Sequence, residues 1–312
     1  MTNATLPQPA PPSATNGWSA WDAFLVSVSE TGFMQSSWWA DFRVEAGYGN
    51  FGVVLRNRGA ILGGAVVLTY EYAPGHCFYY IPEGPVLPAG ERAASEVFAT
   101  VLGFRAVPGF KDCFMESRDT LCIDLRPPEP AILAQMKPKG RYNIGVARRH
   151  GVVVIEDNSR RGLASFLRIY QATARRQGLE PKPRAYFEGL TRKLAALGQG
   201  TVFFAEHRGR RIAAAVVVYL GSRATYFFGG SLAASRELMA PYLLHFEIMM
   251  RAKAMGCEWY DLWGVAPPGE PDHAWQNISV FKRKFGGVEV RLVPTLDLVY
   301  DRVAYDRYGT CG

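Results

Sequence analysis

The chain repeats one pattern of β-rich runs about 150 residues apart, and this repeat limits the folds that it can adopt. In the first copy, Arg58-Gly59 lies between two such runs, and the aromatic run Phe78-Tyr79-Tyr80 follows them. In the second copy, Arg208-Gly209 and Tyr226-Phe227-Phe228 take the same places. A glycine in a short break between β-rich runs favours a tight hairpin. Each copy is therefore predicted to form a meander of three strands.

Helical patterns accompany both meanders. Residues 93–104 follow the first meander and residues 237–255 follow the second, so both copies have the order helices, three strands, helix, strand. Two unrelated α+β segments would also share some of this pattern, because aliphatic strands resemble one another. Duplication is the better interpretation. It predicts an α+β (mixed α/β) protein of two similar domains.

Composition fits two folded domains. The 312 residues, 48% of them hydrophobic, supply enough apolar surface for two cores. Residues 1–17 have neither a basic start nor a continuous apolar run, so they are predicted to form a disordered tail and not a secretory signal. No run approaches the ~20 apolar residues of a membrane helix. These features predict a cytoplasmic protein without a transmembrane segment.

The five cysteines include no Cys-x-x-Cys pair, which argues against a zinc site and a disulfide scaffold. The net charge of +7 is unevenly placed, because residues 131–155 contain no acidic residue. The basic residues of this stretch are Lys137, Lys139, Arg141, Arg148 and Arg149. One interpretation is a solvated helix face. The other is a surface for nucleic acid or a phosphate-bearing ligand.

Four segments carry a resemblance to a known family. Residues 136–152 resemble the inter-domain segment of the Fem-type (FemABX) aminoacyltransferases, which build the interpeptide bridge of peptidoglycan. Residues 33–36, leading to Trp39, and residues 80–86 resemble two further motifs of that family. Residues 281–287 resemble its C-terminal signature, which is the most specific of the four. The resemblance spans most of residues 30–290.

The resemblance implies a fold of two tandem GNAT-like (acyl-CoA N-acyltransferase-like) domains. Residues 18–143 plus about 292–312 would form the first domain, which holds the acceptor. Residues 144–291 would form the second domain, on the aminoacyl-tRNA side. Only two helix-length segments fit between Arg161 and Val202, so the chain resembles the members without a coiled-coil insertion.

The resemblance also implies an activity. The family transfers an amino acid from aminoacyl-tRNA to an amine in the stem peptide of a peptidoglycan precursor or a similar peptide. The partners would be aminoacyl-tRNA and a nucleotide-linked or lipid-linked muramyl peptide, the latter bringing peripheral contact with the inner membrane face. Both are polyanions, which would explain the basic stretch. No metal or organic cofactor is implied.

The predicted chemistry is direct aminolysis, which needs positioned reactants and stabilisation of a developing oxyanion, but no enzyme nucleophile. The sequence has no Gly-x-Ser-x-Gly elbow. Lys282 is the candidate for electrostatic help, and the resemblance implies that Phe281 and Lys282 contact the donor. The alternative for Lys282 is an exposed basic turn. Asp261, at the end of a predicted strand, would either handle the incoming amine or cap a loop.

The acceptor side is predicted from the resemblance. Arg43 and Arg184 lie where it places phosphate-binding residues, and arginine suits bidentate phosphate contact. Tyr80 and Tyr186 would stack on a nucleotide or sugar, or else serve as ordinary structural aromatics.

Two other functions remain alternatives. An acyl-CoA-dependent GNAT N-acyltransferase would share the fold, although neither meander is followed by a phosphate-binding loop with the required spacing. A non-catalytic nucleic-acid-binding protein would use the basic stretch alone.

Overall fold

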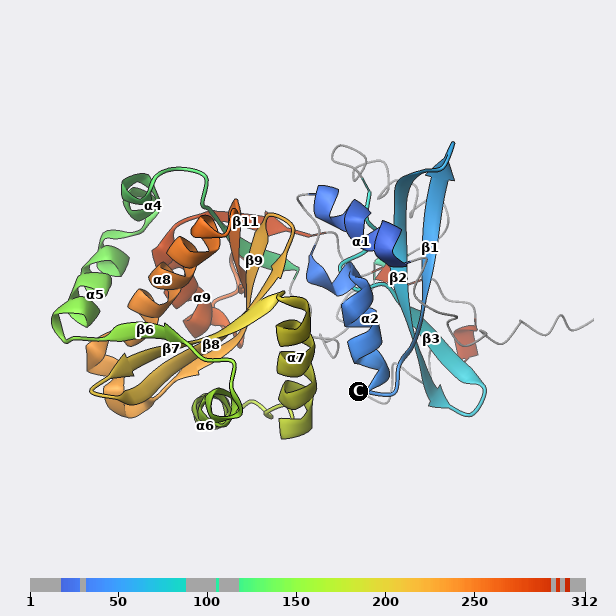
Figure 1. Cartoon of the computed structure of the whole chain (residues 1–312). Coiled ribbons are helices and arrows are strands. Elements are labelled where there is room, and N and C mark those ends of the chain that lie inside the picture. Colours follow the sequence, from blue (N-terminus) through green and yellow to red (C-terminus); the bar gives the residue numbers. More distant parts are fainter. Residues whose placement is uncertain are drawn as a thin grey trace, which may run out of the picture. The chain divides into compact units, whose positions relative to one another are not determined.

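The computed structural model describes residues 18–28, 32–87, 105–106, 118–292, 296–297 and 301–303 (Figure 1). The chain divides into two compact units, Met1–Glu91 and Arg92–Gly312. Both combine helices with a largely antiparallel sheet, which confirms the predicted α+β class. The predicted tail 1–17 and the predicted helix 93–104 lie outside the described residues.

The first unit consists of helices beside a three-stranded antiparallel sheet of order β1-β2-β3. Its elements are α1 (Trp18–Ser27), the 3₁₀ helix η1 (Phe33–Gln35), α2 (Ser37–Val44), β1 (Gly49–Asn57), β2 (Ala60–Ala73) and β3 (His76–Tyr80). Trp21 and Leu25 of α1 and Ala40 of α2 bury their side chains against Val66 and Leu68 of β2. Burial of these apolar side chains holds the helices on the sheet.

Gln35 links two of the motifs that carried the family resemblance. Its side chain is fully buried and donates a hydrogen bond from Nε2 to the carbonyl of Pro82. Its Oε1 accepts from the Val66 amide at 2.7 Å, and its own carbonyl accepts from Trp21 Nε1 at 2.7 Å. The motif at residues 33–36 and the loop at residues 80–86 are therefore parts of one local structure.

The second unit is built around a seven-stranded sheet of order β11-β5-β10-β9-β8-β7-β6. Its strands are β5 (Asp119–Asp124), β6 (Val153–Glu156), β7 (Gly200–His207), β8 (Arg210–Leu220), β9 (Arg223–Ser231), β10 (Trp259–Gly264) and β11 (Val288–Arg291). Its helices are α4 (Glu129–Gln135), α5 (Pro138–Arg149), α6 (Arg160–Gln177), α7 (Arg184–Leu197), η2 (Ala233–Leu238), α8 (Ala240–Ala254), α9 (Gln276–Lys282) and η3 (Arg283–Phe285). Two short strands, β4 (Arg105–Ala106) and β12 (Leu296–Asp297), pair with each other.

The predicted repeat is present in the backbone. Strands β1-β2-β3 and β7-β8-β9 are antiparallel meanders. In each meander, a two-residue hairpin turn joins the first strand to the second. Both turns have positive φ at both residues, 48° and 86° at Arg58-Gly59 and 49° and 72° at Arg208-Gly209. This is the type I′ geometry, in which the glycine removes steric strain. A β-bulge precedes each turn, at Leu55/Arg56 and at Ala205/Glu206, so even the irregularity recurs.

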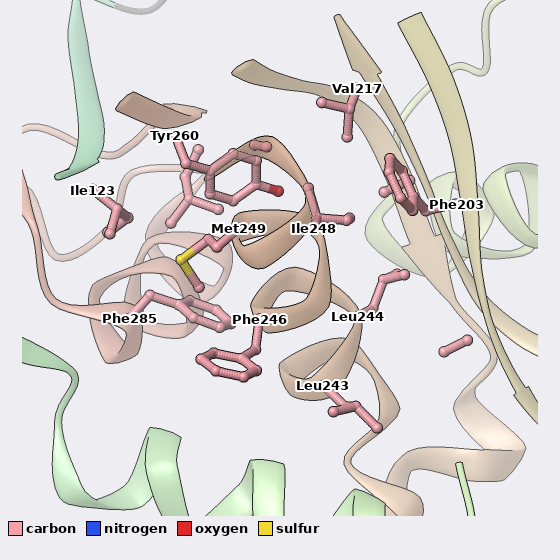
Figure 2. Close-up of a cluster of buried hydrophobic side chains, with 14 of the residues drawn as sticks. Ile123, Phe203, Val217, Leu243, Leu244, Phe246, Ile248, Met249, Tyr260 and Phe285 are labelled. Carbon is pink, nitrogen blue, oxygen red and sulfur yellow. The ribbon is translucent and has the colours of Figure 1, made fainter. Parts of the chain in front are cut away.

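Helices cover both faces of the second sheet (Figure 1). On one face, α8 packs with α5 beside it, and its side chains form the largest core of the described residues together with Phe203, Val217 and Tyr260 (Figure 2). On the other face, Phe228 of β9 contacts Tyr170 of α6 and Phe187 of α7. The alternation of side chains along each strand supplies apolar residues to both layers.

The two units do not divide where the sequence placed the domain boundary. That boundary was predicted near Asn143, whereas the contact-based division falls after Glu91. Strand β5 lies in the second sheet, because it pairs antiparallel with both β10 and β11. Helix α5, which contains Asn143, packs on α8 of the same unit. Residues 118–149 therefore complete the second unit. No helix in the described ranges is long and apolar enough to cross a membrane.

Candidate active site

The candidate site lies where two parallel strands of the second unit separate. Strands β9 and β10 pair only from Arg223–Trp259 to Thr225–Asp261. Beyond these pairs β9 continues for six residues, to Ser231, without β10 beside it. The opposite edge of β10 is also irregular, because its pairing with β5 shifts between Asp261 and Gly264. At this divergence the facing edges of β9 and β10 no longer pair with each other, and polar residues lie there.

Lys282 is the cation of this site. It ends helix α9, and only 6% of its surface is exposed. Its Nζ donates a 2.6 Å hydrogen bond to the carbonyl of Gly264 and lies 5.9 Å from the centre of the Tyr226 ring. Burial lowers the pKa of Lys282 to about 8, and the charge of Asp261 opposes part of that shift. The alternative prediction, an exposed basic turn, is therefore wrong for Lys282.

An aromatic cluster surrounds the backbone of Lys282. Phe281 packs 5.1 Å from Tyr242, 5.5 Å from His245 and 5.3 Å from Phe285, measured between ring centres. His245 is buried, and its Nδ1 lies 2.8 Å from the hydroxyl of Tyr260. Burial, with a contribution from the charge of Lys282, lowers the pKa of His245 to about 3. The imidazole is therefore neutral near pH 7 and acts as a packing and hydrogen-bonding group.

Asp261 organises the backbone at the divergence. Its Oδ1 accepts hydrogen bonds from the hydroxyl of Thr120 and, at 2.8 Å, from the amide of Trp263. Its Oδ2 pairs with Arg223 at 3.0 Å. Trp263 has a φ of 65°, which is strained for a bulky residue, and the bond from its amide to Asp261 stabilises this conformation. Asp261 therefore supports the turn that presents the Gly264 carbonyl to Lys282.

Cys122 lies next to this network. Its Sγ accepts a long contact of 3.6 Å from Arg223. Burial and the nearby Asp261 raise the pKa of the Cys122 thiol to about 12. The sulfur therefore stays protonated and is a poor nucleophile.

Two of the predicted acceptor residues lie in the first unit. Arg43 extends from α2, with its guanidinium carbon 4.1 Å from the centre of the Tyr48 ring and 5.7 Å from that of Trp39. Tyr80, in β3, is half-buried and packs against the core formed by α1 and β2. Arg43 is thus positioned by cation–π contacts, and Tyr80 packs as a structural aromatic of the first unit, the alternative given for it above.

The other two predicted acceptor residues lie at the start of α7. Arg184 is exposed and pairs with Glu188 at 2.7 Å. It lines a surface hollow of about 380 Å³ together with Arg168 and Arg175 of α6. The ring of Tyr186 contacts those of Phe187 and Phe228. Arg184 therefore belongs to a local group of arginines, while Tyr186 is anchored by aromatic packing.

The predicted basic stretch is mostly helix α5, and its residues have different surroundings. Arg141 donates to the carbonyl of Met136, at the end of α4, and Arg148 pairs with Glu247 of α8 at 3.0 Å. Lys137 precedes α5. The hydrogen bond from Arg283 lowers the pKa of Glu289, and the charge of Lys137 makes a smaller contribution in the same direction. Lys139 and Arg149 instead lie beside the ring of Tyr142.

Sequence reasoning missed four residues at the divergence. They are Arg223, Tyr226, His245 and Gly264. In the sequence, Tyr226 is one aromatic of a predicted strand, and a single histidine in an apolar helix gives no functional signal. These residues become neighbours of Lys282 and Asp261 only through strand pairing and helix packing.

Comparisons with known proteins agree with this architecture. Residues 139–276 match the acetyltransferase (GNAT) domain family. The crystal structure of FemX superposes with a TM-score of 0.83 at 15% sequence identity, covering 95% of this chain and 99% of that one. The structure of L-PGS from Bacillus licheniformis superposes with a TM-score of 0.56 at 11% identity, covering 95% and 96% of the two chains.

Sequence similarity points the same way. The UDP-N-acetylmuramoylpentapeptide-lysine N(6)-alanyltransferase of Weissella viridescens is 30% identical over 139 residues, which are 44% of this chain and 39% of that protein. The aligned part thus spans about two fifths of that relative. The chain has a FemX-like fold with a GNAT domain, and its resemblance to the Fem family is confirmed.

Proposed function

We propose that this protein is an aminoacyltransferase that joins the amino acid of an aminoacyl-tRNA to an amine of a peptidoglycan-precursor stem peptide. One observation carries the proposal. A buried lysine, Lys282, is fixed at the divergence of β9 and β10 within the unit that contains the GNAT domain match. The similarity to an alanyltransferase acting on a muramoylpentapeptide lysine supports the same substrate class.

The reaction is an aminolysis. The neutral acceptor amine attacks the ester carbonyl carbon, a carbon–nitrogen bond forms, and the carbonyl oxygen becomes negatively charged. The bond from carbon to the ribose oxygen then breaks, the released ribose oxygen takes up a proton, and the amine nitrogen loses one. A fixed cation near the carbonyl or leaving oxygen lowers the energy of this charged intermediate. Lys282 would supply that cation, and no covalent enzyme intermediate is required.

The surroundings of Lys282 suit this role. With a pKa of about 8, most of the side chain is protonated near pH 7. Its bond to Gly264 fixes the ammonium group before substrate arrives, and the low-polarity setting strengthens its interaction with a developing negative charge. Asp261, already engaged by Thr120, Trp263 and Arg223, would position the site and would not take the proton itself.

The proposed partners are polyanions. Aminoacyl-tRNA would be the donor, and Arg43 and Arg184 would bind phosphates of the acceptor, with Tyr80 and Tyr186 as stacking residues. A nucleotide-linked acceptor would place the reaction in the cytoplasm. A lipid-linked acceptor would bring the protein to the inner membrane face.

An acyl-CoA-dependent N-acyltransferase is the second candidate, because the GNAT domain match alone permits it. Two features of the chain disfavour it. Gly229 and Gly230, near the end of the second meander, pack closely against Tyr226 and Thr173 and form part of β9. Helix α8 has Pro241 in its first turn, which removes one of the amides that would bind a pyrophosphate.

The test offers the full chain radiolabelled aminoacyl-tRNA pools with a nucleotide-linked muramyl pentapeptide, beside a reaction with labelled acetyl-CoA. Label is followed into the peptide. Incorporation that requires charged tRNA and is lost on Lys282→Ala supports the proposal and identifies the amino acid. Incorporation from acetyl-CoA alone would replace it with the second candidate.

A further inference from the structure

Helix α5 presents an exposed face with an unusual combination of side chains. Lys139, Tyr142, Val146 and Arg149 recur at intervals of three, four and three residues, so they form one stripe along the helix. The opposite side, which includes Ile144 and Ala147, is buried. Tyr142 is 60% exposed, although it is a large aromatic residue.

Two cations lie at the ring of Tyr142. Lys139 Nζ is 5.6 Å and Arg149 Cζ is 5.7 Å from the ring centre. The two charges therefore lie within about 11 Å of each other, a span in which a nucleic-acid duplex presents several phosphates. Within the described residues, neither side chain forms an ion pair or a hydrogen bond.

The other basic residues of this stretch contribute differently. Arg141 and Arg148 are held by Met136 and Glu247, so they mainly attach α5 to its neighbours. Lys139 and Arg149 make no comparable contact, and residues 131–155 contain no acidic residue that would neutralise them. Two long cationic side chains held near one aromatic ring lose less conformational freedom when they bind an anion.

We infer that the Lys139–Tyr142–Arg149 face of α5 binds the phosphate backbone of an RNA stem, the body of the tRNA donor. This inference rests on the proposed function and adds the surface that binds the RNA. Lys139 and Arg149 contact phosphates, while Tyr142 is a positioning residue that orders both cations. The face carries no exposed large aliphatic residue, which disfavours insertion into a membrane surface, where apolar side chains supply much of the affinity.

The experiment compares two double variants of the full chain that remove the same charge. Lys139→Gln/Arg149→Gln alters the proposed surface, and Arg160→Gln/Arg161→Gln alters the exposed start of α6. Binding of uncharged tRNA is measured across salt concentrations. The first variant is expected to bind about tenfold more weakly, with the slope of log K against log salt reduced by about two. The second variant should match the wild type.

The positioning role is tested at unchanged charge. Tyr142→Leu is expected to weaken RNA binding about two- to fivefold, the size of one exposed cation–π contact, while Tyr142→Phe retains the affinity. Equal losses in both double variants, or no loss in the first, would overturn the RNA surface. The RNA surface would also be overturned if Lys139 and Arg149 were required for binding to anionic phospholipid vesicles but not for binding to RNA.

Turnover separates this inference from the proposed function. With aminoacyl-tRNA as donor, Lys139→Gln/Arg149→Gln should raise KM with little change in kcat. With a short aminoacylated dinucleotide, which lacks the stem, it should behave as the wild type. If the wild type transfers nothing from tRNA, the proposed function fails, and the binding measurements still judge the α5 face. If transfer occurs with unchanged KM in the variant, only the α5 inference fails.

Discussion

The ammonium group of Lys282 lies 2.6 Å from the carbonyl oxygen of Gly264, at the point where β10 leaves its neighbour β9. One end of a helix and one end of a strand thus fix a buried cation in place. The remaining polar groups support this contact. Asp261 holds the turn that contains Gly264, and Arg223 balances the charge of Asp261.

Replacing Lys282 by methionine should abolish most of the catalytic rate. Removing one fixed group that stabilises an oxyanion typically lowers kcat by about 10²–10³. Lys284→Met removes the same charge two residues away, from a half-exposed position, and is the matched control. Steady-state kinetics with aminoacyl-tRNA would measure both. Similar rates for the two variants would remove Lys282 from the mechanism.

The burial of Lys282 predicts a specific pH dependence of stability. Its pKa is about 8 in the folded protein, against the ordinary lysine value of 10.5 in an unfolded chain, so between these pH values the unfolded chain binds more protons. The free energy of unfolding should therefore rise with pH in this window, by up to roughly 3 kcal/mol. Chemical denaturation of wild type and Lys282→Met at pH 7.5 and 10 tests this. The variant should lack the increment, and an equal rise in both proteins would contradict the assignment.

Asp261→Asn should move the alkaline limb of the activity profile. The charge of Asp261 raises the pKa of Lys282, so its removal makes Lys282 lose its proton at lower pH. The fall of kcat on the alkaline side should accordingly shift to lower pH. Asp272→Asn, in an exposed loop, removes the same charge as a control. An Asp261→Asn enzyme that is slower but keeps the wild-type profile would show that Asp261 does not influence the charge of Lys282.

His245 and Tyr260 should behave as a coupled pair. His245→Phe leaves the buried Tyr260 hydroxyl without its hydrogen-bond partner and should destabilise the protein by about 1–3 kcal/mol. Adding Tyr260→Phe should recover part of that loss, as a double-mutant cycle would show. Because His245 titrates at about 3 when folded and near 6.5 when unfolded, it also lowers stability as pH falls below 6.5. Additive losses, or an acid sensitivity that persists in His245→Phe, would contradict this account.

Gln35→Leu should destabilise the first unit. The substitution leaves the Val66 amide and the Pro82 carbonyl without their buried partner, at a cost of about 2–4 kcal/mol. Hydrogen exchange should show reduced protection of the Val66 amide. Gln177→Leu, at an exposed position of α6, should stay within about 0.5 kcal/mol of wild type. Unchanged exchange at Val66 in Gln35→Leu would show that the glutamine does not hold this region.

The sequence by itself determined the local elements. The Arg-Gly hairpins lie between β-rich runs, so two meanders followed from turn chemistry and strand propensity, and both are present. Helices α6 and α7 fill the space between Arg161 and Val202 where two helices were predicted. The motif at residues 281–287 made Lys282 a candidate and carried the resemblance to the Fem family. Each of these features depends on neighbours in the chain, which a sequence displays directly.

Tertiary structure decided which strands pair with one another and which side chains meet at the candidate site. Strand β5 belongs to the second sheet because it pairs with β10 and β11. These partners lie more than 100 residues away in the chain, so the sequence alone did not place the division between the units at Glu91. The same long-range pairing brought Thr120 to Asp261, while helix packing buried Lys282 beside Gly264 and His245 beside Tyr260. Burial and proximity set the pKa of Lys282, and neither is encoded in the residues next to it. The individual helices and strands are therefore largely local information, whereas the assembly of the sheet and the electrostatics of the site arise from long-range pairing and packing.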